Sequence, residues 1–177
     1  MNISLLGVPI ITIPFQHHTT VQQPLLHCLD QLPQTSIMNE DSISKSDWDT
    51  SVKFGNDVQE RPYWNILQPH IDQTIKDAMK RVDITDFQYS VPWYQQYQKK
   101  DHHGWHRHPF ATYNVVYYVE LPQDAHPTVL RNPVDVTQMI TPKVSEGDIF
   151  IFPSCLTHCS PPNPSTQRKT IIAFNIV

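Results

Sequence analysis

The C-terminal half of the chain alternates short apolar segments with turn-forming residues. Runs rich in Val, Ile, Tyr and Phe are separated by clusters of Pro, Asn, Asp and Gln, a pattern typical of β-strands joined by loops. Short strands in this number predict an all-β sandwich or barrel. We predict strands at residues 86–93, 105–108, 113–121, 128–132, 139–144, 147–152 and 170–177.

The N-terminal third has a different pattern. Residues 3–15 are apolar and β-branched, which predicts one or two further strands. Residues 24–32 are compatible with a short helix. Residues 34–61 are polar and lack periodicity, so we expect a long surface loop there, and loops of that length often act as lids.

A helical pattern separates these two parts. Within residues 63–82, apolar side chains recur every three or four positions and form one stripe. Pro69 suits the first turn of a helix, so we expect the helix to begin near Gln68. We expect this helix to pack on the sheet as scaffold.

Composition indicates a soluble globular protein. A chain of 177 residues fits one domain, here residues 1–177, with N-terminal strands and a lid-like loop in 1–60 and a β core in 86–177. Only 17% of residues are charged and the net charge is −4, so a nucleic-acid partner is not expected. No apolar run is long enough to span a membrane. Exposed edge strands are compatible with a monomer or a homodimer.

The cysteines indicate the compartment. Three cysteines, an odd and sparse set, do not form a disulfide framework, so we expect a reducing, cytoplasmic location. Cys155 and Cys159 flank His158, and with two further histidines they could form a closed zinc site. Buried, inert thiols are the simpler interpretation.

The ten histidines are the feature that calls for chemistry. His106 and His108 lie two residues apart, so on one strand their imidazoles would share a face. His158 follows fifty residues later, directly after a strongly apolar segment. Two neighbouring ligands and one distant ligand form a three-coordinate metal site with open positions. His102 and His103 precede the predicted strand and are expected to face solvent.

A basic residue stands at the start of the last strand. Arg168 precedes a segment that is apolar on both faces, and Thr170, two residues on, shares its face. A buried guanidinium needs an anion, because it cannot be neutralised by losing its proton. No carboxylate nearby in the sequence is an obvious partner. A small dicarboxylate ligand would meet that need.

Together these residues resemble the Fe(II)/2-oxoglutarate-dependent oxygenases, and most closely a compact bacterial and phage branch with His-x-His where most relatives have His-x-Asp. The resemblance covers roughly residues 90–177. It depends on the segments His106-Arg107-His108-Pro109, Val115-Val116-Tyr117-Tyr118-Val119, Gly147-Asp148-Ile149-Phe150-Ile151-Phe152-Pro153-Ser154 with His158, and Arg168-x-Thr170 with Ala173-Phe174-Asn175.

The resemblance implies a mainly β fold, a double-stranded β-helix (jelly roll, cupin-like) with one long helix on the major sheet. It implies that His106, His108 and His158 bind Fe(II). It further implies that Arg168 binds the distal carboxylate of 2-oxoglutarate, assisted by the residues Thr170, Tyr118 and Tyr97. A neutral histidine at the usual carboxylate position leaves the iron site one unit more positive.

The implied reaction consumes O₂ and decarboxylates 2-oxoglutarate to succinate while a small-molecule or peptide substrate is hydroxylated or otherwise oxidised. Two alternatives remain open on the sequence. One is a three-histidine, cupin-type dioxygenase that does not use 2-oxoglutarate. The other is a non-enzymatic jelly-roll binding module with a structural metal.

Overall fold

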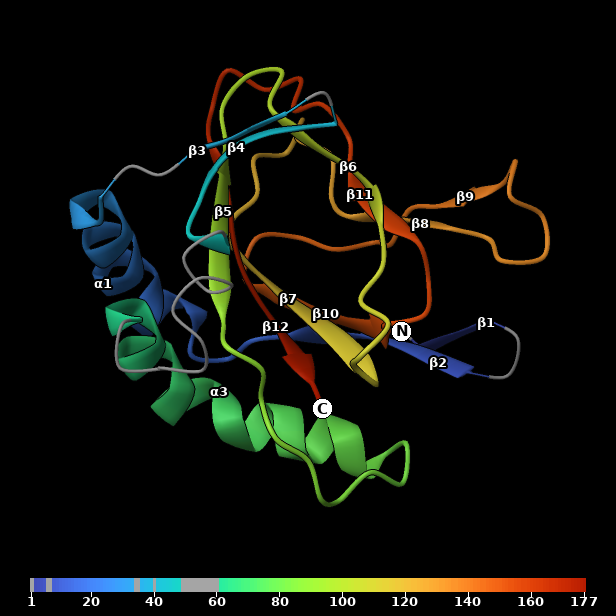
Figure 1. The fold of residues 1–177 in the computed structure, drawn as a ribbon. Helices are drawn as coiled ribbons and strands as arrows, with labels where there is room; N and C mark the ends of the chain where they lie inside the picture. Colours follow the sequence, from blue (N-terminus) through green and yellow to red (C-terminus); the bar gives the residue numbers. More distant parts are fainter. Residues whose placement is uncertain (1, 6–7, 34–35, 40, 49–60) are drawn as a thin grey trace.

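The computed structural model describes residues 2–5, 8–33, 36–39, 41–48 and 61–177. Two helices and a curled antiparallel sheet make up these parts (Figure 1). The helices are α1 (His18–Gln31) and α3 (Pro62–Lys80). The strands are β1 (Asn2–Leu5), β2 (Val8–Pro14), β3 (Ser36–Asn39), β4 (Ser42–Ser46), β5 (Trp93–Tyr97), β6 (His102–His106), β7 (Tyr113–Glu120), β8 (Val129–Arg131), β9 (Met139–Ile140), β10 (Asp148–Pro153), β11 (His158–Ser160) and β12 (Lys169–Ile176).

The strand order explains how the sheet curls. Neighbours follow the path β1-β2-β10-β7-β12-β5-β4-β6-β11-β8-β9, with β3 paired to β4. Strand β4 pairs with β5 on one side and with β6 on the other, so it joins the two halves of the curl. The result is the mainly β jelly-roll architecture that the sequence resemblance implied.

Alternation along the strands separates two cores. On β12, the side chains of Ile172 and Phe174 join the core under the helices, whereas Ile171 and Ala173 join the core inside the curl. Both faces of this strand are therefore buried, as its continuous apolar run predicted. The inner core is the one that borders the functional site.

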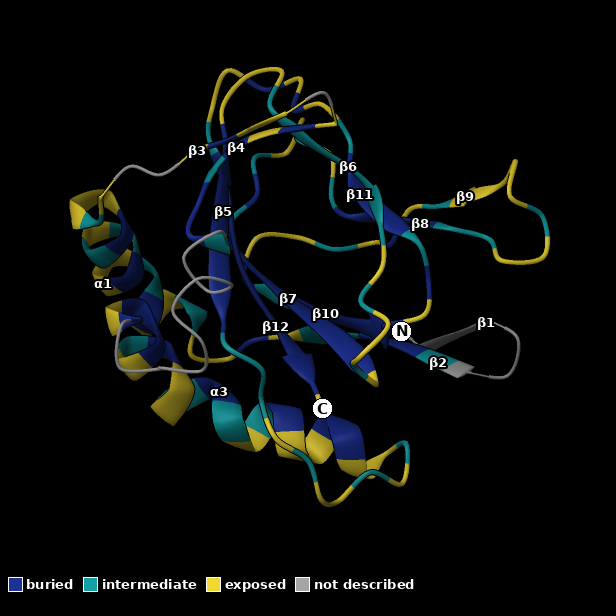
Figure 2. Cartoon of the chain, viewed as in Figure 1, coloured by how far each residue is buried: buried dark blue, intermediate teal, exposed yellow. Residues whose placement is uncertain are grey.

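The helices cover the outer face of the sheet (Figure 2). The expected long helix is α3, but it begins at Pro62 and not near Gln68, and Pro69 lies inside it. Pro62 occupies the first turn, where a missing N–H is tolerated, so the helix starts one proline earlier than predicted. Helix α1 is also longer than the predicted segment 24–32. No helix among the described residues has the length and apolar character needed to cross a bilayer.

Several predicted boundaries need correction. Residues 36–39 and 42–46 form a hairpin within the segment expected to be a loop, and residues 49–60 of that segment lie outside the described residues. The predicted strands 86–93 and 105–108 are replaced by β5 and β6, each shifted in sequence. Strand β11, which carries His158, was not predicted because it has only three residues.

Candidate metal centre

Three histidines converge inside the curl of the sheet. His106 ends β6, and His158, the first residue of β11, is its direct cross-strand partner. His108 lies two residues beyond the end of β6, so it joins the group from a loop rather than from the strand face that was predicted. One ligand nitrogen from each ring lies within 4.8 Å of the other two. The predicted convergence of these three side chains is therefore present.

Hydrogen bonds fix which nitrogen of each strand histidine is available. His106 Nδ1 lies 2.8 Å from the carbonyl oxygen of Gly104, and His158 Nδ1 lies 3.0 Å from that of Leu156. A carbonyl oxygen only accepts, so each Nδ1 carries the proton and each Nε2 keeps its lone pair. Hydrogen bonds from the ring nitrogen that faces away from the metal orient metal-binding histidines in this way.

Aromatic side chains hold the third histidine. The ring of His108 stacks on Trp93 with centroids 5.5 Å apart, and Trp48 meets it edge-on at 5.7 Å. Burial lowers the pKa of all three imidazoles, that of His108 to about 4 and that of His158 well below its usual value. The rings are therefore neutral at pH 7 and fit a divalent metal ion without first losing protons.

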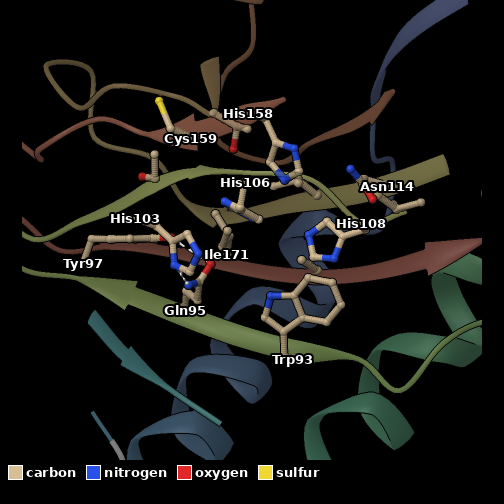
Figure 3. A pocket seen from close by; sticks show the side chains of 15 residues that line it. Trp93, Gln95, Tyr97, His103, His106, His108, Asn114, His158, Cys159 and Ile171 are labelled. Atoms are coloured by element: carbon tan, nitrogen blue, oxygen red, sulfur yellow. Dashed lines mark hydrogen bonds between the residues drawn. The ribbon is translucent and has the colours of Figure 1, made fainter. Parts of the chain in front are cut away.

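The triad lines a pocket inside the curl (Figure 3). The side chains of β5, β7 and β12 form one wall and those of β6 and β11 the other, as expected for a site enclosed by the two halves of the sheet. The lining residues are Trp93, Gln95, Tyr97, His103, His106, His108, Asn114, Val115, Val116, Thr128, His158, Cys159, Ser160, Ile171 and Ala173.

Comparisons with known proteins agree with this geometry. Residues 91–175 match the family model described as "Putative 2OG-Fe(II) oxygenase". This span contains the three histidines and the pocket walls. Residues 91–175 belong to the 2OG-Fe(II) oxygenase family. The family comprises enzymes that use Fe(II), 2-oxoglutarate and O₂, and the neutral three-nitrogen donor set fits such a metal ion.

Solved structures share the oxygenase fold over nearly the whole chain. A Pseudomonas putida prolyl-4-hydroxylase is similar with a TM-score of 0.69 and 11% identity, covering 97% of this chain and 93% of the hydroxylase. A Trichoplax adhaerens prolyl hydroxylase, in complex with a peptide of the hypoxia inducible factor oxygen degradation domain, is similar with a TM-score of 0.64 and 16% identity. The match covers 94% of this chain and 82% of the hydroxylase. The viral collagen prolyl hydroxylase of Paramecium Bursaria Chlorella virus-1, in its 2OG complex, is similar with a TM-score of 0.59 and 14% identity, and the match covers 94% of each chain. No curated protein matches the chain in sequence.

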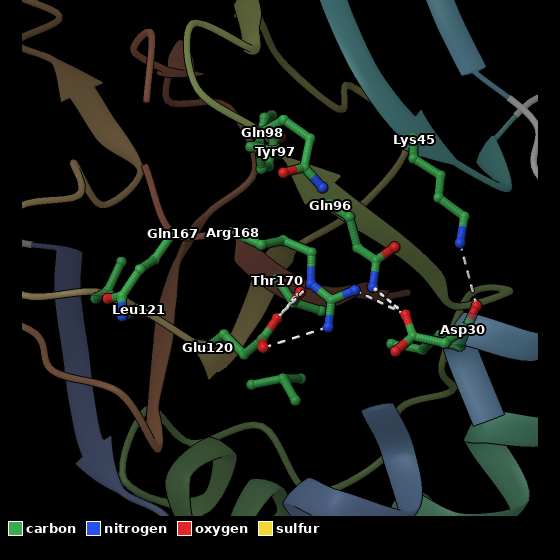
Figure 4. Close-up of polar contacts among 12 residues, drawn as sticks. Asp30, Lys45, Gln96, Tyr97, Gln98, Glu120, Leu121, Gln167, Arg168 and Thr170 are labelled. Carbon is green, nitrogen blue, oxygen red and sulfur yellow. Dashed lines mark hydrogen bonds and ion pairs between the residues drawn. The ribbon is translucent and has the colours of Figure 1, made fainter. Parts of the chain in front are cut away.

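Arg168 lies outside the pocket of the oxygenase. Its guanidinium donates to Glu120 at 2.8 Å and to Asp30 of α1 at 2.7 Å, on the helix-covered face of the sheet (Figure 4). Thr170 shares that face, as predicted, and its hydroxyl also donates to Glu120. The expectation that Arg168 lacks a carboxylate partner is wrong, because both partners are distant in sequence and are brought in by β7 and α1.

Lys169 is the basic residue on the inner face of β12. Its side chain is buried, Nζ donates to Ser160 and to the carbonyl oxygen of His126 at 2.9 Å, and it lies 4.4 Å from the ring centre of Tyr97. Among the described residues no carboxylate pairs with it. Burial lowers the pKa of Lys169 to about 7. The sequence led us to expect a buried basic residue without a carboxylate partner at Arg168. In the structure that residue is its neighbour, Lys169.

The two tyrosines named from the sequence both point into the curl. Tyr97 lines the pocket, and its hydroxyl donates to Gln95 at 2.8 Å. Tyr118 belongs to the inner core, and its hydroxyl accepts the backbone N–H of Thr128 at 3.0 Å. Only Tyr97 is thus in direct contact with the pocket space.

A fourth histidine lines the pocket. His103 was expected to face solvent, but its Nδ1 lies 2.8 Å from Gln95 Nε2 and its ring is 4.3 Å from that of His106. The pairing of β6 with β11 slips by one residue between these two histidines, so the bulge turns both side chains to the same side. The sequence pattern missed His103 because the strand was predicted to begin at residue 105, whereas β6 begins at His102.

The cysteines are not part of the metal group. Cys155 is exposed, and Cys159 is buried at the pocket wall. Among the described residues, the group with converging ligand atoms consists of the three histidines without either thiol. A closed zinc site built from cysteine and histidine is therefore not the arrangement seen.

Proposed function

We propose that His106, His108 and His158 bind Fe(II) in this oxygenase and that Lys169, rather than Arg168, binds the distal carboxylate of 2-oxoglutarate. The buried ammonium of Lys169 carries this proposal, because it contacts the pocket residues Tyr97 and Ser160 and pairs with no carboxylate among the described residues. A charge-assisted bond to a carboxylate stabilises a buried cation that otherwise has only neutral partners. Tyr97 and Ser160, which touch Lys169, would border the same carboxylate.

The proposed reaction is hydroxylation or a related oxidation of an organic substrate. Bound Fe(II), with 2-oxoglutarate and O₂, supplies a strong oxidant while the keto acid becomes succinate and CO₂. The contribution of this chain is geometric and electrostatic. The carbonyl oxygens of Gly104 and Leu156 orient two ligands, Lys169 fixes one end of the cosubstrate, and the apolar walls at Ile171 and Ala173 exclude water.

A cupin-type dioxygenase that uses three histidines without a keto acid is the second candidate. The three-histidine ligand set favours it, since most relatives have a carboxylate in place of His108. It leaves the buried ammonium of Lys169 without a role, and for that reason it ranks second.

Anaerobic titration separates the two candidates. With Fe(II) and 2-oxoglutarate together, the first predicts a visible charge-transfer band that neither component gives alone. Lys169→Met, which keeps the contact with Tyr97, should lose the band yet retain iron, while Arg168→Met should keep both. Iron binding with no band in the unsubstituted protein would favour the cupin-type reaction. Stimulation of succinate release from 2-oxoglutarate by members of a panel of peptides and metabolites then identifies the substrate.

A further inference from the structure

One buried polar side chain in the pocket has no partner. Asn114 is 3% exposed, and both its Oδ1 and its Nδ2 lack a hydrogen bond. Buried amide atoms are costly to leave unpaired, so such a group indicates a ligand that pairs it. Asn114 lines the same pocket as the triad.

The position of Asn114 separates it from the proposed cosubstrate end. Figure 3 shows it beside His108 and His158, on the opposite side of the triad from Tyr97. Tyr97 and Ser160, which contact Lys169, mark the other end of the pocket. A keto acid anchored on Lys169 would therefore leave the Asn114 end to the second substrate.

A second amide continues this polar patch. Asn175 of β12 is the direct cross-strand partner of Asn114, so both side chains leave the same face of the sheet. Its Oδ1 is also buried and unpaired. Together the two side chains offer one unpaired donor atom and two unpaired acceptor atoms, with Asn114 at the pocket and Asn175 beside it on the same face.

The surroundings define the charge of the group that enters. Among the described lining residues none is Asp, Glu, Lys or Arg. A charged substrate group at this end would remain unpaired. A neutral group with one donor and one acceptor, which is an amide, matches Asn114 on both atoms.

We propose that Asn114, with Asn175, binds an amide group of the substrate and so selects amide-bearing compounds, either peptides or small carboxamides. This inference depends on the proposed oxygenase function. Asn114 is a specificity-determining residue, and it plays no part in holding the metal or the keto acid.

Matched amides and esters test the proposal. The probes are a mixture of N-acetyl amino-acid N-methylamides, the matching O-acetyl 2-hydroxy-acid methyl esters, in which both amides are replaced by esters, and short peptides of the same residues. Two quantities are measured on adding each probe: the release of succinate, and the change of the anaerobic charge-transfer band. We expect amides to stimulate release and perturb the band, and esters to do so less. Peptides that act better than single residues identify the peptide source, and the reverse identifies small carboxamides.

Variants assign the effect to the side chain. Asn114→Leu should raise KM for amides by about tenfold or more, because two hydrogen bonds are lost, and should leave KM for esters and the band without probe unchanged. Asn132→Leu, on the β8–β9 hairpin, is the matched control and should change none of these. If Asn114→Leu fails to fold, Asn114→Ser, which is smaller and keeps one polar atom, is measured in the same way.

Three results would overturn the proposal, and they are distinguishable. An unchanged KM for amides in Asn114→Leu, or stimulation only by compounds without an amide, rejects the assignment of Asn114 while the oxygenase function stands. Absence of the band in the unsubstituted protein with Fe(II) and 2-oxoglutarate rejects the proposed function itself, and the inference with it.

Discussion

Arg168 and Lys169 are sequence neighbours whose side chains leave opposite faces of β12. The guanidinium of Arg168 meets Glu120 and Asp30 under helix α1, whereas the ammonium of Lys169 lies on the Tyr97 ring inside the curl. One residue therefore stabilises the fold and the other faces the site. This division allows each role to be tested by substituting one residue and using its neighbour as the control.

The affinity for 2-oxoglutarate should fall as the pH rises above 7. Burial lowers the pKa of Lys169 to about 7, so above that pH the free protein must take up a proton to present a cation to the carboxylate. The affinity for 2-oxoglutarate then falls by up to about tenfold per pH unit, until the pH reaches the pKa of Lys169 in the complex. Anaerobic titration of the charge-transfer band between pH 6.5 and 9 measures it. Lys169→Arg, which stays charged, should bind with a flat profile. An equal slope in that variant would assign the titration to another group.

Arg168→Met should reduce stability without reducing cosubstrate binding. The substitution removes bonds to Glu120 and Asp30, and the half-buried Glu120 carboxylate keeps its hydrogen bond from the Thr170 hydroxyl. Because Asp30 is largely exposed, we expect a loss of about 1–2 kcal/mol in unfolding free energy. Urea unfolding measures the loss. If stability is unchanged and 2-oxoglutarate no longer binds, the original assignment of Arg168 as the clamp is restored.

His158→Ala should abolish retention of iron, whereas His103→Ala should not. Removing one of three converging nitrogens leaves two ligands, too few for a stable site. His103 lies beside His106 but is not part of the converging group, and Gln95 engages its Nδ1. Metal content after anaerobic loading and desalting is the measurement. Loss of iron from the His103 variant would indicate a four-histidine site.

Gly104→Ala should destabilise the protein and weaken the metal site together. A Cβ at this position would lie 2.7 Å from the carbonyl oxygen of Asp41, which is backbone and cannot move aside cheaply. We expect a loss of about 1–3 kcal/mol from this overpacking. The Gly104 carbonyl oxygen also orients His106, so iron affinity should fall. Ala111→Gly, in the following loop, is a control for a change of similar size. Full stability of Gly104→Ala would mean that the β3–β4 hairpin adjusts freely.

Much of the fold follows from local patterns. The strands at β7, β10 and β12 are found within a residue or two of their predicted positions, because each is a strongly apolar, β-branched run. The shifted strands β5 and β6 are polar or rich in histidine, so their hydrophobic pattern is weak. Asn114 did leave a signal, since it is a polar residue inside an apolar strand, yet its lack of a partner is visible only in the structure.

By itself, the sequence determined the identity of the three converging histidines, the apolar strands and the shared face of Arg168 and Thr170. The tertiary structure decided which face of β12 is the interior. Both faces of that strand are apolar, so alternation shows that Arg168 and Lys169 diverge but not which one enters the pocket. The helices α1 and α3 decide it by covering one face, and the β6 bulge likewise decides that His103 joins the site. These are long-range packing effects, and no local pattern encodes them.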